Sequence, residues 1–156
     1  MILKLQLPGL TLELNADEDC KSHYISVQGD YVHYKAEGYI FGYDGWLTHL
    51  HLIENALAGE GKSRFKISSI DEDFWFYYEP PEEQSISLVD RELVLTTKEK
   101  FWVAVTLLKD GAVTGNHISM QIDREEAQAV LNYFRFVKGE LSEEETLKMV
   151  KEGFFK

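Results

Sequence analysis

The chain has almost no cysteine, because Cys20 is the single thiol among its 156 residues. One thiol cannot form an internal disulfide, whereas small secreted domains usually depend on several. Three acidic residues directly precede this thiol, and their charge disfavours the thiolate that a cysteine nucleophile needs. We therefore expect no structural disulfide, no catalytic cysteine and a reducing compartment, the cytoplasm.

Long hydrophobic runs are also absent. No apolar stretch approaches the roughly 20 residues that a helix needs to cross a bilayer. Residues 1–14 alternate between apolar and polar types and contain neither a basic segment nor a small-residue cleavage site, so we interpret them as strand rather than signal peptide. These features predict a soluble protein without a membrane-spanning helix.

Basic residues are too few to balance the acids. The chain has 16 lysines and arginines against 27 aspartates and glutamates, a formal net charge of −11. Residues 71–92 carry −7 of this charge, with eight acids and one base. Such a chain repels nucleic-acid phosphates and anionic membranes and attracts basic proteins. We expect a basic protein partner, and neither nucleic acid nor membrane.

Motifs for catalysis or cofactor binding are missing. The sequence contains no GxGxxG, P-loop, CxxC, HExxH or GxSxG pattern. His49 and His51 lie two residues apart in a predicted helix, where their side chains should point to nearly opposite faces. With 27 acids, accidental carboxylate pairs carry little information. The sequence predicts no catalytic residue, no cofactor and no metal site, and so a non-enzymatic protein.

What the sequence does contain is many strand patterns. Alternating apolar residues predict strands over 2–7, 10–14, 23–28, 31–36, 64–70, 73–79, 85–90, 92–97, 100–109 and 116–122. In the last of these, Ile118, Met120 and Ile122 should face inward, and His117, Ser119 and Gln121 outward. We expect the strands to form a largely antiparallel sheet.

One helix is predicted between these strands. Its apolar stripe consists of Trp46, Leu50, Ile53 and Leu57, spaced as on one face of a helix. Asp44 is a possible N-cap, and Gly59 stands where a helix commonly ends.

Two further helices are predicted at the end of the chain. Asp123 with Glu126, and Ser142 with Glu145, have the spacing of a capping box. Runs of strands with helices inserted once and then at the end indicate a single α+β domain over residues 1–156. We expect a mostly antiparallel meander with one inserted helix and two C-terminal helices.

Five consecutive aromatic residues, 74–78, form the most unusual segment. In a strand, Phe74, Phe76 and Tyr78 face one side, and Trp75 and Tyr77 the other. The second pair meets either a helix, 46–58 or 123–138, or a binding partner, and Trp and Tyr are frequent interface hot spots. The predicted partner-binding residues are Glu72, Asp73, Trp75, Tyr77, Glu79, Glu82 and Glu83.

The order of elements is similar to that of bacterial immunity proteins that neutralise polymorphic toxins, particularly those paired with cell-wall-associated toxins. The shared features are an N-terminal strand region, a helix-like segment 45–62, a strand meander and a closing strand and helix, 117–140. The resemblance implies a non-enzymatic cytoplasmic protein that binds and blocks a toxin domain, often a basic nuclease. It assigns no individual site residue.

Two other functions fit the sequence. The chain could be a structural or regulatory domain that self-associates through an exposed sheet face, as a homo-oligomer. It could instead bind a small molecule, or act as an enzyme, in a pocket lined by Tyr31, Tyr34, Tyr39, Phe41 and Trp102.

Overall fold

The computed structural model describes residues 2–7, 10–16, 23–30, 33–36, 47–68, 74–109 and 112–152. Its strands are β1 (Ile2–Leu7), β2 (Leu10–Ala16), β3 (His23–Gly29), β4 (His33–Ala36), β5 (Phe65–Ser68), β6 (Phe74–Glu79), β7 (Glu83–Leu88), β8 (Arg91–Thr96), β9 (Lys100–Lys109) and β10 (Ala112–Ile122). Its helices are α2 (Leu50–Leu57), α3 (Arg124–Lys138) and α4 (Glu143–Glu152). The predicted α+β fold is confirmed. Cys20, Asp44 and Trp46 lie outside the described residues.

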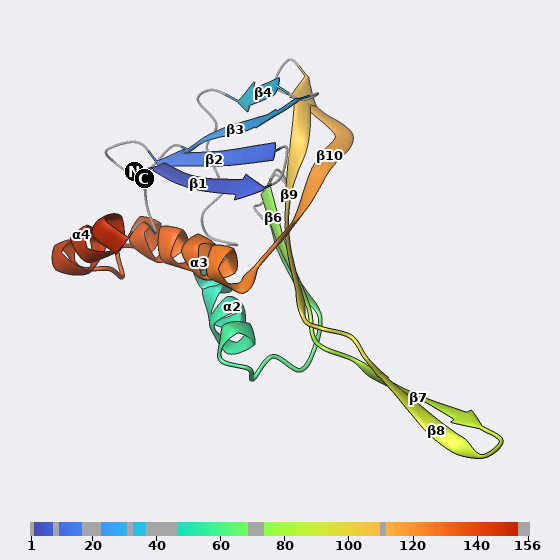
Figure 1. Ribbon diagram of the computed structural model, residues 1–156. Helices are drawn as coiled ribbons and strands as arrows, with labels where there is room; N and C mark the ends of the chain where they lie inside the picture. The colour runs from blue at the N-terminus through green and yellow to red at the C-terminus, as the bar shows by residue number, and fades with distance from the viewer. Residues whose placement is uncertain are drawn as a thin grey trace.

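The strands form three antiparallel sheets rather than one. The N-terminal sheet has the order β1-β2-β3-β4, and the central sheet has the order β10-β9-β6-β5. Among the described strands, β7 and β8 pair only with each other. The expectation that residues 85–97 continue the main sheet is therefore wrong. Pairing of β6 with β9 stops at Glu79, and Pro80 and Pro81, which have no N–H to donate, follow directly. Beyond them β7 and β8 project from the body as a two-stranded arm (Figure 1).

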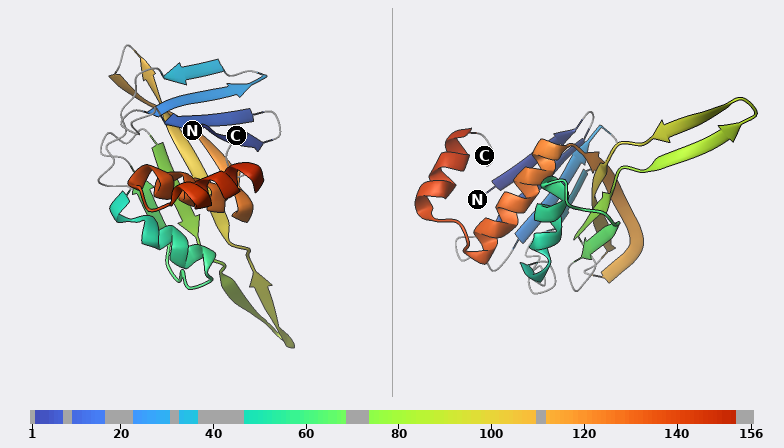
Figure 2. Two further views of the ribbon diagram at one scale, coloured as in Figure 1. Left: turned by 90° about the vertical axis from the view of Figure 1, so that its left-hand side faces the viewer. Right: turned by 90° about the horizontal axis from the view of Figure 1, so that it is seen from below.

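Alternate residues of β6 show where the core lies. Phe74, Phe76 and Tyr78 are buried, and the rings of Phe74 and Phe134 of α3 lie 6.0 Å apart. Helices α2 and α3 lie together on this side of the central sheet (Figures 1 and 2). Leu5 and Leu12 of the N-terminal sheet join the same apolar cluster.

Strand β10 follows the predicted alternation. Its buried or half-buried residues are Ile118, Met120 and Ile122, and its exposed ones are His117, Ser119 and Gln121. The inward and outward sets are therefore confirmed.

Helix α3 begins and ends where its sequence indicates. The Asp123 carboxylate accepts from the Glu126 backbone N–H at 2.8 Å, and the Glu126 side chain accepts from the Asp123 N–H at 2.8 Å. These bonds satisfy donors that the first turn of a helix leaves free. At the other end Gly139 has φ 78°, a left-handed conformation that favours glycine. Ser142 and Glu145 form the second predicted capping box before α4.

The inserted helix differs from its prediction at His49. Residues 47–48 are helical, but the chain bends at His49 and α2 starts at Leu50. Because His49 stands outside the helix, its ring stacks on that of His51, with centroids 6.3 Å apart. The prediction that these two side chains point apart is wrong for this reason. The predicted end is confirmed, since Gly59 follows the helix with φ 79°.

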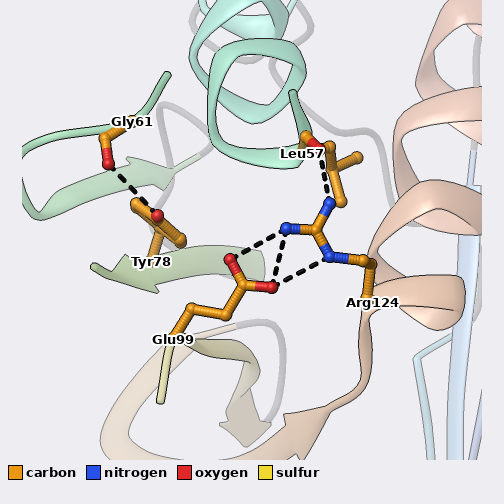
Figure 3. A network of polar contacts seen from close by, with 5 residues as sticks. All are labelled: Leu57, Gly61, Tyr78, Glu99 and Arg124. Carbon is orange, nitrogen blue, oxygen red and sulfur yellow. Dashed lines mark hydrogen bonds and ion pairs between the residues drawn. The ribbon is translucent and has the colours of Figure 1, made fainter. Parts of the chain in front are cut away.

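Arg124 joins three parts of the fold (Figure 3). Its Nε and Nη2 donate to the Glu99 carboxylate at 2.9 and 3.0 Å, a two-pronged ion pair, and its Nη1 donates to the Leu57 carbonyl. That carbonyl belongs to the last turn of α2, whose acceptors have no partner within the helix. Beside this network the Tyr78 hydroxyl donates to the Gly61 carbonyl at 3.2 Å. Glu99 lies between the arm and β9, so the network fixes the base of the arm to both helices.

Replacing Leu50 should measure how much the packing of α2 contributes to the stability of the fold. Leu50 is buried at 3 % exposure, so Leu50→Ala should lower the free energy of unfolding by about 2–4 kcal/mol through lost burial and a residual cavity. Asn55→Ala, an exposed position on the same helix, should change it by less than about 0.5 kcal/mol. Urea titration measures both values. A loss under about 1 kcal/mol for Leu50→Ala would show that this side chain is not in the core.

Tyr78 should make the fold sensitive to alkaline pH. Burial raises the pKa of Tyr78 above its ordinary value of 10.0, the Glu99 carboxylate raises it further, and Arg124 opposes the shift. The folded state thus favours the neutral hydroxyl. This contribution to stability is complete below pH 10 and is lost as the pH rises through the folded pKa.

Tyr78→Phe separates this effect from that of the other tyrosines. The variant loses the bond to Gly61, a constant cost of about 1 kcal/mol, but it has no group to ionise. Urea titrations across the alkaline range should show wild-type stability falling more steeply with pH than that of the variant. Equal slopes would contradict the role of Tyr78.

Candidate binding surface

The central sheet has a second face, which points away from α2 and α3. Directly opposite residues in neighbouring strands share a face, and the register aligns two rows across it. The first row is Lys66, Tyr77, Trp102 and Gln121, and the second is Ser68, Trp75, Ala104 and Ser119. We call this the outer face.

An aromatic cluster with one cation occupies the middle of the outer face. The rings of Trp75 and Tyr77 meet edge to face with centroids 6.0 Å apart, and His117 lies 5.3 Å from Trp75. Lys66 Nζ stands 4.4 Å from the centre of the Trp75 ring and 6.0 Å from that of Tyr77. An ammonium over an aromatic face is attracted to it by the ring quadrupole. Trp75 and Tyr77 are half-buried.

A groove of about 570 Å³ opens beside this cluster. Its lining residues are Arg64, Phe65, Lys66, Tyr77, Tyr78, Glu79, Trp102 and Ser119. Two of its three charged groups already have partners, since Arg64 pairs with Glu82 at 3.1 Å and Lys66 lies over the rings. The groove is thus aromatic with a nearly neutral rim.

The structure brings most of the predicted partner-binding residues together. Trp75, Tyr77 and Glu79 alternate onto the outer face, and Tyr77 and Glu79 line the groove. Glu82 is at its edge through the pair with Arg64, while Glu83 begins β7 and so belongs to the arm. Glu72 and Asp73 lie outside the described residues.

Sequence reasoning missed five of the eight groove residues, Arg64, Phe65, Lys66, Tyr78 and Ser119. Lys66 lies opposite Tyr77, and Ser119 lies opposite Ala104, through a cross-strand register that the sequence does not display. The sequence predicted Trp102 as one residue of a small-molecule pocket, and Trp102 does line the groove. The alternation of β9, with Phe101 and Val103 buried, could also have placed it on this face. Tyr31, Tyr39, Phe41 and the Tyr34 side chain lie outside the described part of the chain.

The chain matches no known protein family, no curated protein and no solved structure. Among the described residues, no group of three or more histidines, cysteines and acids is arranged to hold a metal ion. Within the same ranges, no helix is long and apolar enough to cross a membrane. The outer face has to be interpreted from its own chemistry.

Removing the cation should loosen the aromatic cluster. Lys66→Gln keeps much of the side-chain length but loses the attraction to the Trp75 ring, and should cost about 0.5–1 kcal/mol of stability. Lys62→Gln removes the same charge from an exposed position before β5 and serves as the control. Urea unfolding followed by tryptophan fluorescence measures both. Equal losses in the two variants would mean that net charge, rather than the ring contact, is responsible.

Proposed function

We propose that this chain is a non-enzymatic binding protein of the cytoplasm, an immunity protein that neutralises a basic toxin domain. The observation that carries the proposal is the aromatic groove on the outer face of the central sheet. The toxin docks there, with Trp75, Tyr77 and Trp102 as its main contacts.

The aromatic residues suit a protein interface. Trp and Tyr dominate interface hot spots because each offers a large rigid surface with a polar tip. Ordering side chains on binding usually costs free energy, but the contacts among Trp75, Tyr77 and Lys66 already restrict these rings. More of the contact energy therefore remains as affinity.

Charge favours a basic partner from a distance. The groove is nearly neutral, so attraction comes from the net charge of −11 spread over the protein. Such a field accelerates encounter with a cationic protein and weakens with added salt. Electrostatics should thus determine the association rate, and the aromatic contacts the dissociation rate.

A second function has its own supporting observation. The groove volume falls within the roughly 300–1,000 Å³ typical of small-molecule sites. Arg64 and Lys66 beside Tyr77 and Trp102 would suit a flat anionic ligand. If aromatic carboxylates raise the melting temperature of the wild type but not of Lys66→Gln, and a basic protein causes no such shift, small-molecule binding is favoured over toxin binding.

The test is binding kinetics against a basic toxin domain encoded beside the gene. Trp75→Ala or Tyr77→Ala should raise the dissociation rate, costing about 2 kcal/mol or more for a true hot spot. Glu82→Gln with Glu83→Gln should mainly lower the association rate, and salt should lower it for the wild type. Surface plasmon resonance at several salt concentrations separates the two rates.

The control is Leu147→Ala, which removes an exposed apolar side chain from α4 on the far side of the molecule (Figure 1). It should leave both rates unchanged. Thermal unfolding of each variant confirms that it is folded. A folded Trp75 or Tyr77 variant with wild-type rates would place the toxin elsewhere, and a toxin domain that fails to bind would refute the immunity function.

A further inference from the structure

The arm formed by β7 and β8 has two chemically different faces. Its register pairs Gln84 with Leu95, Ile86 with Leu93 and Leu88 with Arg91, and each pair shares one face. This apolar face carries Ile86, Leu88, Leu93 and Leu95, which are 41–46 % exposed. The opposite face carries Glu83, Ser85, Ser87, Glu92, Val94 and Thr96. A hydrogen bond from Ser85 to Glu92 confirms that these two side chains lie on the same side.

The apolar face of the arm needs a cover. Every residue of β7 and β8 is exposed, and the arm extends away from the body in all three views (Figures 1 and 2). An isolated two-stranded hairpin is at best marginally stable in water, and an amphipathic sheet normally buries its apolar side. The arm nevertheless has a firm base, because Thr97 N–H donates to the Glu82 carbonyl at 2.8 Å and Glu99 is held by Arg124.

The charges of this face indicate what covers it. The face carries no acid and one base, Arg91, so a basic protein would gain no ion pair there and would meet a like charge. A second arm fits better. When two arms pack head to tail across a twofold axis, Ile86 and Leu93 meet their own copies, and the pair Gln84–Leu95 faces the pair Leu88–Arg91 of the second copy. Arg91 then lies diagonally across from Gln84, whose amide oxygen accepts from a guanidinium. Packing in the same direction would instead make the pair Leu88–Arg91 face its own copy, which brings the two Arg91 side chains close together.

We propose that the β7–β8 arm is a self-association element, through which two copies of this chain pack apolar face against apolar face across a twofold axis. Such a contact uses the same surface of both copies, as twofold interfaces do. It is independent of the proposed toxin site, since the groove lining comes from outside the arm.

The size of the arm limits the strength of this dimer. Six residues of strand span about 20 Å, and two strands lie about 5 Å apart. This footprint is well below the roughly 800 Å² per partner of a standard stable interface. The dimer should therefore be a reversible one that forms with rising concentration.

Two neighbouring residues of β8 provide a matched test. Leu93 lies on the apolar face and Val94 on the polar face, 45 % and 54 % exposed, and threonine keeps the strand tendency at either position. Leu93→Thr should weaken dimerisation at least about fivefold, and Val94→Thr should change it less than about twofold, because the apolar contact lies on one face alone. Sedimentation equilibrium of the full chain, up to about 300 µM for so small an interface, measures both.

A gain-of-affinity variant tests the head-to-tail direction without risk to the fold. Gln84→Glu places a carboxylate diagonally across from Arg91 in the facing pair of the second copy and should tighten the dimer about two- to tenfold at low salt, an effect that salt removes. Ser85→Glu adds the same charge to the polar face and should not tighten it. A dimer that is tightened by Gln84→Glu but not by Ser85→Glu supports the proposal.

Three results would overturn the proposal. The first is a wild-type chain that stays monomeric over the whole concentration range. The second is equal weakening by Leu93→Thr and Val94→Thr, which would mean that neither face is specific. The third is a monomeric chain whose Leu93→Thr variant loses affinity for a basic toxin domain, since the arm would then contact that partner. Loss of toxin binding in Trp75→Ala with an intact dimer would leave the arm proposal standing and concern the groove alone.

Discussion

Alternation along β6 is the constraint on which most of this structure depends. A strand turns successive side chains to opposite faces, so five consecutive aromatics cannot all enter one core. Phe74, Phe76 and Tyr78 are buried under the helices, where the ring of Phe74 lies near that of Phe134. Trp75 and Tyr77 have no place in that core and form the outer face instead. The same pleat thus supplies both the stability of the domain and its candidate binding surface.

A second constraint separates the arm from the body. Two prolines end the ladder after Glu79, and β9 begins its pairing at Lys100, opposite that residue. Between these points the hairpin leaves the central sheet, and Arg124 holds its base through Glu99 while also capping α2 at Leu57. One guanidinium therefore couples the end of a helix, the start of another and the base of the arm. This arrangement lets a small domain present two surfaces, a groove and an arm, in a defined relation to its helices.

Charge and contact have separate roles in the proposed function. The net charge of −11 acts over the whole protein, yet the groove holds Arg64 and Lys66 as well as Glu79. The excess of acid between 71 and 92 therefore does not translate into an acidic pocket. Glu82 neutralises a neighbouring arginine, and Glu83 and Glu92 lie on the polar face of the arm. A basic partner would be attracted by the protein as a whole and retained by its aromatic rings.

The sequence by itself determined whatever depends on neighbours along the chain. It was sufficient for the α+β class, for the alternation of β10, and for the capping boxes at Asp123 and Ser142, because strand pleat and helix caps act within a few residues. It placed Trp75 and Tyr77 on one face for the same reason. Only the tertiary structure decided the break at His49, the departure of the arm and the meeting of Lys66 with Trp75, since these follow from contacts between distant segments whose register no local pattern records.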